Sequence, residues 1–316
     1  MFELFPFRRQ RSAAPAATYD EALRRFHQLQ IRERSPDDGC ILNERCHSLL
    51  LDHGAQTDHA LVLIHGFTNC PYQFQQLAPL IHQQGHSVLA IRLPRHGCAD
   101  RMTAALAELR IGELLDAVME AVDIAHGLGR AVTVLGFSMG GVLAAWLAQN
   151  RADLQRVILV SPAVGLQALP PHRHRLIGYG LAVLPNFFQW WHPKLKTERI
   201  GPDHAYPRFA SRSLAVLIRL GLAVRTQAAQ QRPAATAITV ITNPSDTVIH
   251  HPSVERLVQN WSAHGATVVA HTFPVEWNLL HDIIDPLQEE QQVERVYPKL
   301  LQWIGESLQP VPAPAV

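Results

Sequence analysis

The stretch Ala131-Val-Thr-Val-Leu-Gly-Phe-Ser138-Met-Gly-Gly-Val-Leu-Ala-Ala145 decides the fold of this 316-residue chain. A β-branched run leads directly into Gly-x-Ser-x-Gly, and a run of small residues typical of a helix follows at once. In that context the serine lies at a sharp strand-to-helix turn, with its hydroxyl clear of the sheet. Gly136 and Gly140 suit such a turn, because a side chain at either position would clash with neighbouring backbone. The alternative, a nucleotide-binding turn with an incidental serine, lacks GxGxxG or P-loop spacing.

Short apolar runs alternate with helical stretches on both sides of this turn. Strands are expected at 61–64, 88–91, 132–135, 156–160, 238–242 and 267–272, and helices at 72–84, 111–127, 140–150, 252–264 and 288–303. An antiparallel lead-in strand fits within 41–51, and a further helix fits Tyr19–Arg34. The alternation predicts an α/β fold with a mostly parallel central sheet flanked by helices on both faces.

The alternation stops between residues 163 and 232, where the chain is helical in character, rich in Pro and Trp, and without a convincing strand. We expect an N-terminal extension with a helix (1–34), an α/β core (35–162 and 233–308), an inserted helical cap (163–232) and a Pro-rich disordered tail (309–316). The cap has ten Lys/Arg and two Asp/Glu, about +8 in a chain of net charge +1. This charge either holds the cap on an acidic body or faces an anionic lipid or a carboxylate-bearing substrate.

A serine in this turn needs an acid and a base that follow it in the chain order Ser…Asp…His. Asp246 comes directly after the expected strand 238–242, where its carboxylate can orient a histidine; a turn aspartate is the alternative. His281 follows the last expected strand, whereas His271 lies inside the strand pattern. We therefore expect Ser138, Asp246 and His281 to form a catalytic triad.

The negative oxygen of a tetrahedral intermediate needs preorganised donors. One is the N–H of Met139, directly after the serine, and the other is the N–H of Phe67, which follows a buried strand ending in His65-Gly66. His65 is expected to brace this loop, and the side chains of Met139 and Phe67 to lie against the acyl group. The cap adds an aromatic cluster that either packs a small core or forms an acyl-pocket wall or interfacial anchor. Its members are Phe187, Phe188, Trp190 and Trp191.

Bulk composition narrows the class of protein. With 47% hydrophobic and 17% charged residues, the chain has enough apolar material for one large core. A net charge of +1 gives no electrostatic attraction to nucleic acid. No apolar run is long enough to span a membrane, and the N-terminus lacks the apolar stretch of an export signal.

A cytoplasmic location is expected, with free thiols at Cys40, Cys46, Cys70 and Cys98, which show no CxxC spacing. No HExxH occurs among the eighteen histidines, and neither metal nor cofactor is expected.

Taken together, these motifs resemble the monoacylglycerol lipase and bacterial carboxylesterase branch of the α/β-hydrolase superfamily, over roughly residues 61–303. The segments that carry the resemblance are 65–68, 92–97, 136–141, 245–246 and 281–282. Arg95 stands where that branch usually has glycine, so a differently shaped loop is expected there. The resemblance implies a serine carboxylic-ester hydrolase.

The apolar walls expected for its pocket favour short-to-medium acyl esters or monoacylglycerol-like lipids, cleaved through an acyl-enzyme on Ser138. Amidases, peptidases and thioesterases use the same triad, and a non-catalytic hydrolase-like protein that binds a ligand is the alternative class.

Overall fold

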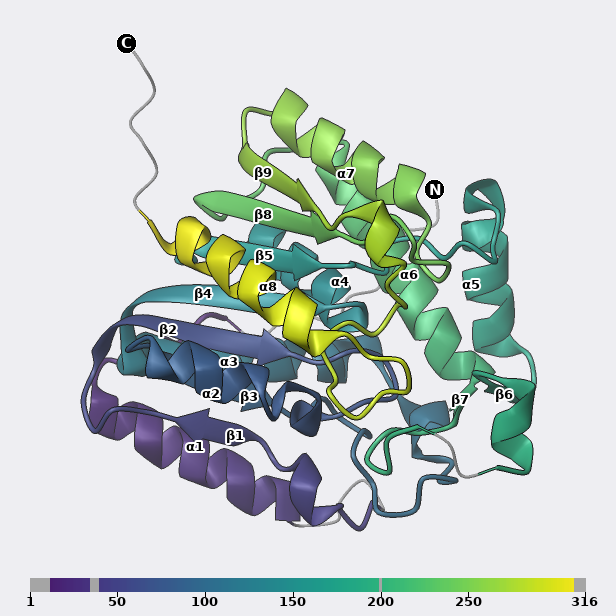
Figure 1. Ribbon diagram of the computed structural model, residues 1–316, viewed down its shortest axis with the longest axis horizontal. Helices are drawn as coiled ribbons and strands as arrows, with labels where there is room; N and C mark the ends of the chain where they lie inside the picture. The colour runs from purple at the N-terminus through teal and green to yellow at the C-terminus, as the bar shows by residue number, and fades with distance from the viewer. Residues whose placement is uncertain (1–11, 35–39, 199–200, 310–316) are drawn as a thin grey trace.

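The computed structural model describes residues 12–34, 40–198 and 201–309, and its centre is a seven-stranded sheet (Figure 1). The strands are β1 (Leu49–Leu51), β2 (Thr57–Ile64), β3 (Ser87–Ile91), β4 (Gly129–Phe137), β5 (Arg156–Val160), β8 (Ala237–Thr242) and β9 (Thr267–Thr272). They lie in the order β1-β3-β2-β4-β5-β8-β9, and within this sheet every neighbouring pair is parallel except β1 with β3. The prediction of an α/β fold with a mostly parallel sheet is confirmed.

Helices cover both faces of the sheet. The helices of the described residues are α1 (Tyr19–Arg34), α2 (Leu77–Gln83), α3 (Ile111–Leu128), α4 (Met139–Asn150), α5 (His174–Val183), α6 (Ser211–Ala228), α7 (His251–Ala263) and α8 (Val293–Leu308), of which α5 packs on α6 in the cap. Short 3-10 turns lie at Glu44–Cys46, Pro71–Phe74, Ala105–Glu108, Pro171–Arg173, Pro193–Lys196 and Val275–Trp277. One face is covered by α3, α4, α6 and α7, with α1 packed on α3, and the other face by α2 and α8 (Figure 1).

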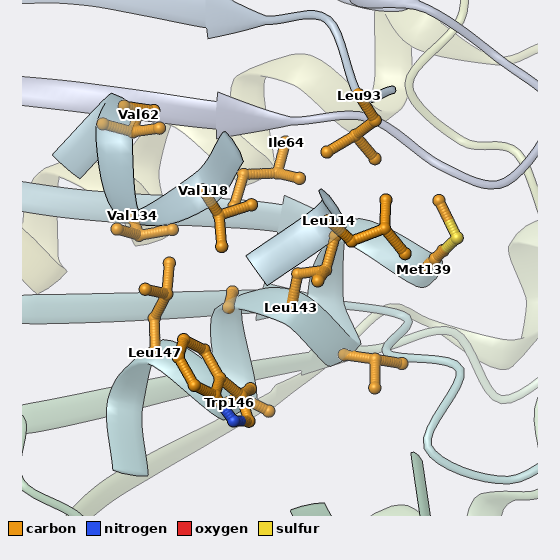
Figure 2. Close-up of a cluster of buried hydrophobic side chains, with 14 of the residues drawn as sticks. Val62, Ile64, Leu93, Leu114, Val118, Val134, Met139, Leu143, Trp146 and Leu147 are labelled. Atoms are coloured by element: carbon orange, nitrogen blue, oxygen red, sulfur yellow. The ribbon is translucent and has the colours of Figure 1, made fainter. Parts of the chain in front are cut away.

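The side chains on the two faces of β2 belong to two separate hydrophobic cores. Val62 and Ile64 point into the core that α3 and α4 cover, and Leu61 and Leu63 point into the one that α2 and α8 cover. This is the two-residue alternation of a strand, and all four side chains are fully buried because helices cover both faces. Figure 2 shows the first core, in which side chains of β2 and β4 face those of α3 and α4.

The chain leaves the sheet between β5 and β8 and forms α5, two short strands and α6 beside the carboxyl ends of the strands (Figure 1). The expectation that this segment contains no strand is wrong, because β6 (Phe188–Trp190) pairs antiparallel with β7 (Arg208–Ala210). Each strand has three residues, and the two are too far apart in sequence for a local hairpin signal. Helix α6 also packs against α4 and α7, which joins the end of the insertion to the helical layer.

The expected helix at 288–303 begins later, at Val293, because the preceding residues form turns. The Asp282 carboxylate accepts hydrogen bonds from the N–H groups of Ile284 and Asp285, and Asp285 accepts one from Leu287. These bonds shape residues 282–287, and Glu290 then adopts a φ of 56°, which an α-helix cannot contain, so the helix begins only after it. Residues 310–316 of the expected disordered tail lie outside the described residues.

The expectation of free thiols is wrong, because the four cysteines form two disulfides, Cys40–Cys98 and Cys46–Cys70. The bonded pairs are 58 and 24 residues apart, and the fold brings their Cα atoms to 5.3 and 5.4 Å. Disulfides are typical of oxidising compartments, so they argue against the expected cytoplasmic location. Within the described ranges, no helix combines the length and the apolar character needed to span a bilayer.

Candidate active site

Ser138 lies at the turn between β4 and α4, with φ of 54° and ψ of −112°. A non-glycine residue with positive φ is strained, and such strain holds the hydroxyl in a fixed direction. Two glycines make the turn possible. A Cβ atom at Gly136 would lie 2.1 Å from the Gly140 carbonyl oxygen, and one at Gly140 would lie 2.0 Å from the Ile64 carbonyl oxygen. Any larger residue at either position would therefore displace backbone.

The structure brings the three expected catalytic side chains into one hydrogen-bonded chain. His281 Nε2 lies 2.8 Å from Ser138 Oγ, and His281 Nδ1 lies 2.6 Å from Asp246 Oδ2. Since an ionised carboxylate only accepts, Nδ1 carries the proton and Nε2 is left to accept from the serine. The residues follow β4, β8 and β9 respectively, so the carboxyl edge of the sheet assembles them.

Asp246 is held as a charged acceptor. Its Oδ1 accepts from the N–H groups of Val248 at 2.8 Å and Ile249 at 3.3 Å, which leaves Oδ2 for His281. Burial alone would raise the pKa of Asp246, but the charge of His281 and these hydrogen bonds outweigh it and lower the pKa below its usual range. The carboxylate therefore stays ionised and can stabilise an imidazolium.

His271, the alternative base, lies elsewhere. It belongs to β9, its ring stacks on Trp303 at 4.9 Å between centroids, and its Nε2 is 3.9 Å from a carboxylate oxygen of Glu306. The structure thus assigns it to the packing of α8 on the edge of the sheet.

Hydrogen bonds of His65 hold the peptide between Gly66 and Phe67, in the loop at residues 65–70. Leu93 N–H donates to His65 Nε2 at 3.1 Å, so His65 Nδ1 carries its proton and donates to the Gly66 carbonyl at 2.9 Å. In a trans peptide the N–H points away from the carbonyl, so the Phe67 N–H faces the other way. Among the described residues it has no backbone or side-chain acceptor. His65 therefore braces the loop.

One expectation about a side chain is wrong. The side chain of Met139 is fully buried in the core under α3 and α4, beside Leu114, and does not line the cavity (Figure 2). Its N–H lies in the first turn of α4, directly after Ser138. Arg95 adopts a φ of 64°. It thus takes the left-handed conformation that glycine favours, and its guanidinium pairs with Glu113 at 3.2 Å.

A cavity of about 630 Å³ opens over Ser138 and His281. Its walls are mostly apolar and come from both the sheet and the cap. They include Phe67, Leu166, Trp190, Trp191, Tyr206, Phe209, Leu214, Leu217 and Val248. Of the aromatic residues expected at the pocket, Phe67, Trp190 and Trp191 line it. Phe187 is half exposed and Phe188 lies under the guanidinium of Arg208, so neither reaches the cavity.

The cap is attached directly to the 65–70 loop. Trp191 Nε1 donates to Thr68 Oγ1 at 2.9 Å, and Tyr206 N–H donates to the Thr68 carbonyl at 2.8 Å. The rings of Phe67, Trp191 and Phe209 pack together with centroids 4.6 to 5.9 Å apart. Tyr206 and Phe209 were missed from sequence, where nothing but their aromatic character separates them from other cap residues.

A model of the Alpha/beta hydrolase family matches residues 61–290 of this chain. A thermostable monoacylglycerol lipase from Bacillus sp. (strain H-257) is 27% identical over 113 residues, which are 34% of this chain and 42% of that protein. Phospholipase YtpA from Bacillus subtilis (strain 168) is 30% identical over 126 residues, 39% of this chain and 48% of that protein. The match thus spans less than half the length of either relative.

Solved structures with the same fold cover most of the chain. The structure described for the metagenome-derived lipolytic enzymes LipS and LipT has a TM-score of 0.63 and 18% identity, over 84% of this chain and 99% of that one. Monoacylglycerol lipase from Paleococcus ferrophilus has a TM-score of 0.60 and 16% identity, over 83% and 98%. At such identities the likeness concerns the fold alone.

Proposed function

Because the chain belongs to the Alpha/beta hydrolase family, we propose that it is a serine hydrolase that cleaves carboxylic esters through an acyl-enzyme on Ser138. The observation that carries the proposal is the hydrogen-bonded chain from Ser138 through His281 to Asp246, at the floor of an apolar cavity. A serine hydroxyl is a weak nucleophile until an adjacent base takes its proton, and this geometry supplies that base.

In the proposed reaction, Ser138 Oγ attacks the ester carbonyl while its proton passes to His281 Nε2. The N–H groups of Phe67 and Met139 stabilise the negative oxygen that forms. His281 then gives the proton to the departing alcohol, which leaves the acyl group on Ser138. Water, deprotonated by the same histidine, attacks that acyl group and releases the acid, and the serine regains its proton.

The cavity supports short-to-medium acyl chains or a monoacylglycerol-like lipid as substrates. Its walls offer apolar contacts on the sheet side and four aromatic residues on the cap side, and its lining includes a few polar side chains such as Asn69 and Gln288. A mostly apolar pocket with few polar groups binds an acyl chain by burial and orients it by the reacting carbonyl. The lipase and phospholipase names of the two Bacillus relatives are consistent with this class.

A panel of p-nitrophenyl esters, with acyl chains from two to sixteen carbons, tests the proposal. We expect the highest kcat/KM at short-to-medium chains and a loss of several orders of magnitude in Ser138→Ala. A fluorophosphonate should label the wild type and leave Ser138→Ala unlabelled. Equal turnover by both proteins would rule out the mechanism, and a folded wild type that neither turns over nor labels would favour a non-catalytic binder.

We further propose that the cap meets an anionic lipid surface. Large apolar side chains are exposed on the cap; they are Leu176, Val183, Leu184, Phe187 and Trp191. The cap is also the basic part of the chain, at about +8. Exposed apolar groups beside basic ones favour the interface of an anionic bilayer. Trp191 also lines the cavity, as Trp190 does, so the proposed anchor comprises the other four residues, Leu176, Val183, Leu184 and Phe187.

Co-sedimentation with vesicles tests this surface. The chain should pellet with phosphatidylglycerol vesicles and less with phosphatidylcholine vesicles, and added salt should reduce the difference. Leu176→Ser/Val183→Ser should weaken pelleting, while Val275→Ser, at an exposed apolar residue outside the cap, serves as the control. Equal pelleting with both vesicles would contradict the electrostatic part of the proposal.

A further inference from the structure

A hydrogen-bond bridge joins the 65–70 loop to the segment that carries His281. Its centre is Gln73, which lies on the 3-10 turn Pro71–Phe74 and is 1% exposed. Gln73 Oε1 accepts from the Gly66 N–H at 2.9 Å, and Gln73 Nε2 donates to Asp282 Oδ2 at 2.8 Å. Because a backbone N–H only donates and a carboxylate accepts, the two partners fix the orientation of the amide.

Asp282 extends the bridge into the turn after His281. Its Oδ1 accepts from the N–H groups of Ile284 and Asp285, and its Oδ2 also accepts from Gln288 Nε2 at 3.1 Å. Burial and the charge of Asp285 raise the pKa of Asp282, so the carboxylate depends on its donors to remain charged. The side chain that follows the catalytic histidine is therefore held in place partly by Gln73.

The other end of the bridge acts on the proposed oxyanion hole. The Gly66 N–H is held by Gln73 and the Gly66 carbonyl by His65, which together fix the peptide that carries the Phe67 N–H. The Gly66 backbone packs closely on one side, since a Cβ atom there would lie 3.1 Å from the Phe137 ring, and hydrogen bonds set the orientation of its peptides. Loss of one anchor would let this peptide rotate away from the serine.

We propose that Gln73 is a positioning residue for the reaction. Its amide joins Gly66 to Asp282, and in this way it holds the Phe67 N–H in a fixed position relative to Ser138 and His281. This inference rests on the proposed function. Gln73 itself acts only through Gly66 and Asp282. Its loss should therefore affect the transition state, where the oxyanion donor is needed, more than the binding of substrate.

Gln73→Leu tests the inference, with Gln76→Leu as the matched control, because Gln76 is an exposed glutamine three residues away whose side chain caps nothing. We expect kcat for a p-nitrophenyl ester to fall on the order of 10- to 100-fold in Gln73→Leu, with KM within threefold of wild type. The inhibition constant of an alkyl trifluoromethyl ketone, which forms a tetrahedral adduct with serine, should rise by a similar factor. Gln76→Leu should have the same kcat, KM and inhibition constant as the wild type.

Gln73→Glu keeps the shape of the side chain and its acceptor for the Gly66 N–H, but sets a carboxylate against Asp282. It should fold and also lose kcat, because both ends of the bridge are needed. A kcat within twofold of wild type in both Gln73 variants, or a fall in kcat without weaker binding of the ketone, would overturn the inference. If the wild type itself neither turns over esters nor labels at Ser138, the proposed function fails. If the wild type is active and the Gln73 variants keep its kcat, only this inference fails.

Discussion

Removal of the two disulfides should lower the free energy of unfolding by amounts set by the loops they close. Cys46–Cys70 spans 24 residues and is nested within Cys40–Cys98, which spans 58. On the loop-entropy relation, the inner bond alone contributes about 3.4 kcal/mol and the outer one alone about 4.2 kcal/mol. With both present, the inner bond shortens the effective outer loop to roughly 34 residues, and the pair contributes about 7 kcal/mol.

Urea unfolding of three variants measures these contributions. Cys46→Ala/Cys70→Ala should lose about 3 kcal/mol, Cys40→Ala/Cys98→Ala about 4 kcal/mol, and the variant without all four cysteines about 7 kcal/mol. A reducing agent should bring the wild type to the stability of the last variant. It should leave that variant unchanged, which controls for effects of the reagent on the rest of the chain.

The inner disulfide also bears on activity, because Cys70 ends the 65–70 loop and its bond fixes that loop to the N-terminal segment. Loss of this bond should therefore lower kcat more than loss of the outer one does. Alkylation before and after reduction decides whether the bonds exist. Four thiols alkylated in the unfolded, unreduced chain, or equal stability of wild type and the variant without cysteines, would refute the reasoning.

Three further predictions concern the site and its surroundings. Asp246→Asn and His281→Ala should each lower kcat by about 10³-fold or more with little change in Tm, and near-normal ester hydrolysis by either would remove that residue from the mechanism. Gly140→Ala should lower Tm steeply, since its Cβ atom would lie 2.0 Å from the Ile64 carbonyl oxygen; a wild-type Tm would contradict the described turn. Burial lowers the pKa of His96 to about 4, whereas in the unfolded chain it titrates near 6.5. The unfolded state therefore binds the proton first as pH falls, so this histidine alone should cost about 3 kcal/mol of stability between pH 7 and 4. Urea midpoints against pH should show a shallower slope in His96→Phe.

The sheet and the positions of the three site residues were predictable because each signal is local. A buried parallel strand is a continuous apolar run, and β5, which is buried throughout, begins and ends at the predicted residues. The partly exposed edge strand β9 also begins and ends where it was predicted. The residue that follows such a run must lie at the carboxyl edge of the sheet. Ser138, Asp246 and His281 all come after a strand in this way, so strand order alone brings them to one edge.

Met139 shows where a correct backbone placement gives a wrong side chain. It begins α4 directly after Ser138, as predicted, but its side chain lies in the core (Figure 2). The pattern of the turn specifies the direction of the amide and not what the next side chain contacts. At Arg95 a bulky residue adopts a φ of 64°, the left-handed conformation that glycine favours.

The contacts that shape the proposed oxyanion hole could not be predicted, because each joins residues far apart in the chain. Thr68 meets Trp191 across 123 residues, Cys70 bonds to Cys46 across 24, and Gln73 meets Asp282 across 209. Each partner is an ordinary residue in its own neighbourhood, without periodicity or spacing to mark it. The cap, the N-terminal segment and the loop that carries His281 thus all contact the loop at residues 65–70. A change in any of them should reach the serine through the Gly66–Phe67 peptide, so activity should be sensitive to substitutions that no local motif identifies.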